Sequence, residues 1–203
     1  MRADSYKTIK TYSQGVYKDK GSRFVAEAYP VEDAGQVKTL VEKTRKEHHD
    51  ARHHCFAYMI GPERENLRVN DDGEPSGTAG KPILGQINSF GLTNILIIVS
   101  RYFGGTLLGV SGLINAYRKA AGSAIMNAVI VEKTITDHYE ITFPYGSLNE
   151  VMKILKEENA GHSVRKIDLM CSITVHFRSQ DAGKIIGRLA RTDGLEHRHI
   201  STR

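Results

Sequence analysis

The order of strand-like and helix-like spacings in the last third of the chain constrains the fold most strongly. Apolar residues alternate with polar ones over 139–143 and then recur every three or four positions over 148–155. Two strand-like stretches, a second helical stripe and a last strand-like stretch follow, at 164–167, 173–177, 182–189 and 195–200. This order is βαββαβ, which predicts a ferredoxin-like domain.

Strand and helix patterns are mixed in the earlier part of the chain. Residues 95–99 are apolar throughout and rich in β-branched side chains, which predicts a strand buried on both faces. Asp33 can cap a helix that begins just after it. Further strands are expected over 22–29 and 55–60, and a helix with an apolar stripe over 113–125. The predicted fold class is therefore α+β with two domains, residues 1–131 and 132–203.

The composition is that of an ordinary globular protein of 203 residues, with 40% hydrophobic and 25% charged residues. The longest aliphatic run is too short to span a bilayer, and the first residues lack the apolar core of a signal peptide. Cys55 and Cys171 form no Cys-x-x-Cys pair, so a disulfide framework is not expected. These features predict a cytoplasmic protein without membrane partners. The net charge of +5 is compatible with contact to RNA or the ribosome.

The segment DDGEPSGTAGKP, residues 71–82, is predicted to be a loop because glycine and proline interrupt it repeatedly. Asp71, Asp72 and Glu74 place three carboxylates in four residues. They could hold a hard cation such as Mg²⁺ or supply a general acid or base. The alternative is a solvated turn in which the aspartates bind their own backbone.

Known nucleotide-binding motifs are not matched. Residues 71–82 lack the glycine and hydroxyl positions of a Walker A loop, and RYFGGTLLGVSG at 101–112 lacks the Rossmann glycine spacing. Residues 77–80 and 109–112 each fit Gly-x-x-Gly, a pattern found in loops that clamp RNA and equally in tight turns.

Residues 47–55, EHHDARHHC, resemble a metal cluster by composition alone. His53 and Cys55 are predicted to lie in the next strand, so the histidines straddle a change of element. We therefore expect no metal site here, and Cys55 lacks a catalytic partner signature.

The N-terminal arm mixes lysines and Arg23 with tyrosines, among them Lys18, Lys20 and Tyr17. Basic groups interleaved with aromatic rings suit phosphate contact and base stacking. An amphipathic edge hairpin guarded by lysines is the alternative interpretation.

Four stretches carry a resemblance to the YigZ/IMPACT family: DDGEPSGTAG at 71–80, RYFGG at 101–105 followed by Leu108 and Gly109, ARHHCFAY at 51–58, and KGSRF at 20–24. The C-terminal segment is similar to the second domain of bacterial members, which resembles the last domain of elongation factor G. The resemblance implies that the first domain has the fold of the second domain of a small-subunit ribosomal protein, a βαβ superfold with a left-handed crossover. It also implies a role in translation, because eukaryotic relatives regulate translation by competing for the ribosome-associated activator of a stress kinase. Bacterial relatives are regarded as nucleic-acid-binding or translation-linked proteins.

The leading hypothesis is a non-enzymatic, translation-linked protein that binds RNA or the ribosome, with a protein partner in translation also expected. Its predicted contact residues are Lys18, Lys20, Arg23, His53, Ser76, Thr78, Lys81 and Arg101, on a motif face that includes Asp71, Asp72, Gly73, Glu74, Gly104 and Gly105.

The alternative is a small-molecule enzyme, such as a hydrolase, that uses the same face. Asp72 or Glu74 would then act as a base or metal ligand, His53 as a proton carrier and Arg101 as an anion clamp. No cofactor is expected, except that Mg²⁺ could bind at Asp71, Asp72 and Glu74. A third hypothesis is a protein-interaction module that uses the exposed sheet of the second domain.

Overall fold

A computed structural model describes residues 4–203, which form two compact units. The first unit is Tyr6–Lys133, and the second contains Thr134–Arg203 together with Asp4 and Ser5. The boundary predicted from the sequence falls between residues 131 and 132, close to this division. The independent folding of the two parts stays a prediction.

The first unit is built on an antiparallel sheet of five strands. Its central strand is β6 (Ile95–Tyr102), which is flanked by β3 (Ser22–Pro30) on one side and β4 (His53–Ile60) on the other. The outer strands are β2 (Ser13–Asp19) beside β3 and β5 (Asn66–Asn70) beside β4. A separate two-stranded ladder joins β1 (Ser5–Ile9) to β7 (Ile130–Thr134).

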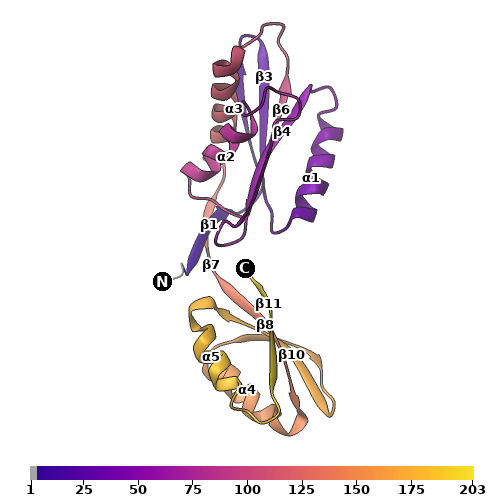
Figure 1. Cartoon of the computed structure of the whole chain (residues 1–203), viewed down its shortest axis with the longest axis vertical. Coiled ribbons are helices and arrows are strands. Elements are labelled where there is room, and N and C mark those ends of the chain that lie inside the picture. Colours follow the sequence, from indigo (N-terminus) through magenta and orange to yellow (C-terminus); the bar gives the residue numbers. More distant parts are fainter. Residues whose placement is uncertain (1–3) are drawn as a thin grey trace. The chain divides into compact units, whose positions relative to one another are not determined.

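Helices cover both faces of this sheet (Figure 1). Helix α1 (Ala34–Glu47) lies on one face, and α2 (Gly80–Ser89) and α3 (Gly109–Met126) lie on the other. Residues 95–99 are fully buried, which confirms the prediction of a strand covered on both faces. Asp33 caps α1 as expected, because its carboxylate accepts a hydrogen bond from the backbone N–H of Gln36.

The prediction of a loop over 71–82 is wrong for its last three residues. Gly80, Lys81 and Pro82 form the first turn of α2. Proline is tolerated there because the first N–H groups of a helix have no partner within the helix. The glycine and proline content therefore conceals the start of a helix.

The second unit is ferredoxin-like, as predicted. The elements are β8 (Thr136–Pro144), α4 (Leu148–Glu157), β9 (Gly161–Lys166), β10 (Met170–Arg178), α5 (Ala182–Leu189) and β11 (Glu196–Thr202), with short 3₁₀ turns at Tyr145–Ser147 and Ser179–Asp181. The sheet has the strand order β11-β8-β10-β9, and all neighbouring pairs are antiparallel. Apolar residues of α4 and α5 pack on one face of this sheet around Ile141, Phe143 and Ile173. The two-domain α+β class is confirmed.

Candidate functional site

Asp71 caps helix α2 from nine residues upstream. Its carboxylate accepts hydrogen bonds from the backbone N–H groups of Gly77 at 2.8 Å, Ala79 at 3.1 Å and Gly80 at 2.8 Å. Burial alone would raise the pKa of Asp71, but these three donors together hold the pKa below its usual range. The carboxylate thus binds its own loop and the N-terminus of α2, as in the solvated-turn alternative.

This arrangement predicts that Asp71→Asn changes how stability depends on pH. A carboxyl group whose folded pKa is lowered stabilises the fold above its unfolded pKa, and this contribution disappears as the pH falls through the folded pKa. The wild type should therefore lose stability on acidification below about pH 4 more steeply than the variant. Urea unfolding at a series of pH values measures this difference, and parallel curves for the two proteins would contradict it.

Asp72 ties the loop to two other elements. Its carboxylate accepts a hydrogen bond from the backbone N–H of His54 at 2.6 Å and forms an ion pair with Arg45 of α1. Its carbonyl oxygen lies 2.8 Å from Nδ1 of His53. Because a carbonyl only accepts, Nδ1 of His53 carries the hydrogen in this contact. Asp72 has φ of +43°, so its backbone adopts the left-handed conformation that these contacts require.

Glu74 is buried at the centre of a polar cluster beneath the loop. One carboxylate oxygen accepts hydrogen bonds from Nη1 of Arg101 at 2.6 Å and from the hydroxyl of Tyr117 at 2.8 Å. The Cys55 thiol lies 3.3 Å from the Tyr117 hydroxyl and 3.0 Å from the Asp71 carbonyl oxygen. Burial raises the pKa of both Cys55 and Tyr117 well above their usual ranges, so both groups are neutral.

The structure separates some residues that the sequence places on one motif face. Arg101 and His53 are paired across β6 and β4 on the face covered by α2 and α3. Arg23 pairs with Tyr102 instead, and its guanidinium stacks on that ring at 4.2 Å on the opposite face. Side chains alternate between the two faces of a strand, so the proposed combination of Arg23 with Arg101 on one face is wrong.

The remaining predicted residues are distributed over the end of the sheet that carries the loop of residues 71–79. Lys18, Lys20, Arg23, Ser76, Lys81 and Gly73 are exposed, whereas Thr78 is buried and donates a hydrogen bond to the Pro75 carbonyl oxygen. Gly104 and Gly105 lie in the loop after β6, where the Gly104 N–H donates to the Ser22 hydroxyl. This contact joins that loop to the β2–β3 hairpin.

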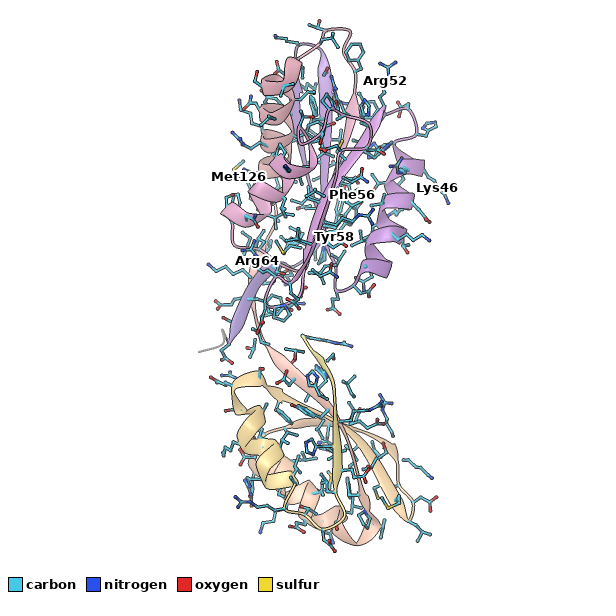
Figure 2. All side chains as sticks on the ribbon, viewed as in Figure 1. Lys46, Arg52, Phe56, Tyr58, Arg64 and Met126 are labelled. Carbon is cyan, nitrogen blue, oxygen red and sulfur yellow. The ribbon has the colours of Figure 1, made fainter. Side chains whose placement is uncertain are left out.

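A pocket of about 340 Å³ lies between the loop of residues 71–79 and the start of α3. Arg52, His53, Glu74 and Arg101 supply its charged and polar lining. Its apolar lining comes from Pro75, Phe103, Leu107, Leu108, Val110 and Leu113, with Gly109 at the first position of α3. Arg52, labelled in Figure 2, lies at the end of the unit away from Arg64 and Met126. The Asp72 carboxylate does not line this pocket.

The histidines after α1 belong to different elements, as expected. Helix α1 ends at Glu47, and β4 begins at His53. His48 lies near the Tyr102 hydroxyl and Glu27, while burial lowers the pKa of His54, whose ring contacts the His48 carbonyl oxygen. Within residues 4–203, no three His, Cys, Asp or Glu side chains are grouped as a metal site would need. A magnesium ion at the acidic loop stays a prediction.

Tyr117 and Arg52 are two residues of this region that sequence reasoning missed. The helical spacing assigns Tyr117 to the apolar stripe of α3, although its hydroxyl is bound within the polar cluster. A tyrosine in a stripe that is otherwise mostly alanine and isoleucine is the available signal, because a buried hydroxyl requires a partner. Arg52 is part of ARHHCFAY but carries no local pattern that marks a pocket.

Comparison with known proteins decides the family. The Impact N-terminal domain model matches residues 20–125. The chain belongs to the IMPACT family. It is 38% identical to IMPACT family member YigZ of Escherichia coli over 138 residues, which cover 67% of this chain and 68% of that protein. It is 34% identical to IMPACT family member YvyE of Bacillus subtilis over 153 residues, covering 75% and 70%.

A solved structure supports the two-domain fold of this IMPACT family member. It is a crystal structure described as that of a hypothetical protein, with 30% sequence identity and a TM-score of 0.76. The match covers 98% of this chain and 98% of that chain. No helix among the described residues is both long and apolar enough to cross a membrane.

Proposed function

We propose that this IMPACT family member is a translation-linked regulatory protein of the cytoplasm that binds RNA, including RNA of the ribosome, without catalysing a reaction. Family membership supports the link to translation, because the resemblance implies that role for eukaryotic relatives. The RNA would be held by the basic hairpin, which we define as Lys18, Lys20 and Arg23 at the β2–β3 turn.

The observation that supports this proposal best is that the acidic side chains of the motif face bind groups within the protein, whereas the basic side chains of the hairpin are exposed. The carboxylates of Asp71, Asp72 and Glu74 all accept hydrogen bonds from donors within the protein. Their negative charge is therefore directed at protein donors rather than presented freely to an RNA phosphate. The residues of the basic hairpin are instead exposed to solvent.

The pairing of the two strands adds to this argument. Lys18 and Arg23 lie directly opposite each other on β2 and β3, so their side chains project from the same face. Like charges in this position destabilise a sheet, and a bound phosphate would relieve their repulsion. Arg23 stacks on Tyr102, so a flat ring also lies beside the cationic pair.

Arg101 is not part of this proposed interface. Its side chain is only 7% exposed and is paired with Glu74, so it is not available to an RNA backbone on the surface. His53 and Thr78 are also left out of the interface. His53 lines the pocket, and Thr78 is buried beneath the loop, where it binds the Pro75 carbonyl oxygen. The enzyme alternative gains no support for Asp72 as a base, because its carboxylate is bound to Arg45 and His54.

The double variant Lys18→Gln/Arg23→Gln is expected to bind RNA more weakly and with less salt dependence. Each lost phosphate contact should reduce the slope of log affinity against log salt by about 0.7 to 0.9. Ribosome co-sedimentation and RNA binding at several salt concentrations measure this slope. A matched control, Lys38→Gln/Arg68→Gln, removes two exposed cations of the same unit outside the hairpin and should leave the slope unchanged. Absent or salt-insensitive association of the wild type would reject the proposal.

A further inference from the structure

The pocket beside α3 has both cationic and apolar side chains in its lining. Arg52 and Arg101 contribute two positive charges, and Glu74 contributes one negative charge that is already bound by Arg101 and Tyr117. The charges of these three side chains therefore sum to one net positive charge. Such a pocket favours an anion over a cation or a neutral molecule.

Arg101 has hydrogen-bonding capacity that its protein partners do not use. Only 5% of this residue is exposed, yet Nε has no hydrogen-bond partner. Its guanidinium binds Glu74 through Nη1 and lies 5.7 Å from the ring centroid of Phe103, which lines the same pocket. Buried polar groups are nearly always paired, so the unpartnered Nε leaves Arg101, a residue that lines the pocket, with one donor that lacks an acceptor.

The N-terminus of α3 supplies further donors on the same pocket. Leu108 stands at the cap position, where its side chain cannot accept a hydrogen bond, and the first turn contains no acidic residue. The N-terminus of α2, in contrast, is capped by the Asp71 carboxylate. Leu108, Gly109 and Val110 all line the pocket, so the uncapped end of α3 adjoins it. Free N–H groups at a helix N-terminus favour an anion.

The pocket also presents unusually exposed apolar side chains. Phe103 is 42% exposed, Leu107 82% and Val110 59%. Three large apolar residues grouped at the mouth of one pocket leave apolar surface in water, which a bound apolar group would cover. The volume of about 340 Å³ is at the lower end of the range of small-molecule pockets.

We propose that this pocket binds a small molecule that carries one oxyanion, a phosphate or a carboxylate, on an apolar or aromatic body. The oxyanion would accept hydrogen bonds from Arg101, from Arg52 and from the N-terminus of α3. The body would pack on Phe103, Leu107 and Val110. This site goes beyond the proposed RNA binding, because it shares no residue with the basic hairpin.

Four probes test the two halves of the proposed ligand: phenyl phosphate, benzoate, inorganic phosphate and benzyl alcohol. Titrations of the full chain, followed by calorimetry and by amide chemical shifts, should show phenyl phosphate or benzoate binding about tenfold more tightly than inorganic phosphate or benzyl alcohol. Comparison of the first two probes identifies the preferred oxyanion. Equal or undetectable binding of all four probes would overturn the proposal.

Leu107→Asp tests the location of the binding site, because it places a negative charge at the mouth of the pocket. Leu107 is largely exposed, so its substitution should not affect folding. It should weaken binding of the preferred probe about tenfold, and Arg52→Gln should weaken it by at least about fivefold. The matched control Leu169→Asp makes the same change at a residue that is 85% exposed in the other unit, and it should leave binding unchanged. Unaltered binding in Leu107→Asp would overturn the assignment. Ribosome association should persist in Leu107→Asp, so failure of either proposal is recognisable separately.

Discussion

Arg101→Met is expected to lower the free energy of unfolding of the Tyr6–Lys133 unit by about 3–5 kcal/mol. The side chains of Glu74 and Arg101 are only 3% and 7% exposed. Removal of the arginine leaves the Glu74 carboxylate buried with the Tyr117 hydroxyl as its remaining donor. A buried charge without its counter-ion costs far more than the loss of an exposed pair.

Urea unfolding followed by tyrosine fluorescence measures this effect in the correct unit. The chain has no tryptophan, and its tyrosines, apart from Tyr139 and Tyr145, lie in the first unit. Glu47→Ala serves as the control, because it breaks the exposed pair with Lys43 and should cost about 1 kcal/mol or less. The double variant Glu74→Leu/Arg101→Met should regain most of the lost stability. A small effect of Arg101→Met, similar to that of Glu47→Ala, would contradict the structural role of the buried pair.

Local periodicity was sufficient to predict the second unit and the central strand of the first. In the second unit, the spacing of apolar residues within each segment predicts a strand or a helix, and the resulting order βαββαβ is that of the ferredoxin-like arrangement, in which β8 pairs with β10 and β11. The run at 95–99 is apolar on both faces, which is the pattern of a covered central strand. In both cases the deciding information lies within a few neighbouring residues.

Helix α2 was missed because its start depends on a residue outside any local capping pattern. Gly80, Lys81 and Pro82 are the types expected in a loop, and no side chain at the cap position accepts a hydrogen bond. Asp71 provides the cap from nine positions upstream, once the loop has folded back on itself. A capping box joins residues three apart, so it does not detect this arrangement.

The predicted motif face was only partly correct because it depends on strand register. Alternation predicts that Arg23 and Phe24 point to opposite faces, but not which of them shares a face with Arg101. The register places Phe24 opposite Arg101 and Arg23 opposite Tyr102. Register between β3 and β6 joins residues far apart in the chain, and the sequence of either strand alone does not specify it. The inward direction of the Asp72 and Glu74 carboxylates is likewise set by donors far along the chain.

Gly104→Ala is expected to destabilise the first unit by about 3 kcal/mol, at the upper end of the range for overpacking. A Cβ atom at Gly104 would lie 1.9 Å from the Gly21 carbonyl carbon and 2.2 Å from the Ser22 nitrogen. Both atoms belong to the backbone of the β2–β3 turn, so no side-chain rotation relieves the overlap. The turn itself is constrained, since Lys20 and Gly21 both have positive φ.

Alanine substitutions at two other glycines serve as controls, because they distinguish the effect of this backbone overlap from the other effects of replacing glycine by alanine. Gly105 has φ of +85° and an added Cβ meets no atom within 4 Å, so Gly105→Ala should cost only the left-handed strain of about 1–2 kcal/mol. Gly85 lies within α2 and is equally unobstructed, so Gly85→Ala should stabilise the unit by about 0.5–1 kcal/mol. Urea unfolding followed by tyrosine fluorescence should therefore give this order from most to least stable: Gly85→Ala, wild type, Gly105→Ala and Gly104→Ala.

Amide chemical shifts provide a second measurement of the overlap. The shifts of Gly21 and Ser22 should change strongly only in Gly104→Ala, because there the hairpin must move away from the loop after β6. A Gly104→Ala variant as stable as the wild type would show that this close approach of the two backbones is not required by the fold.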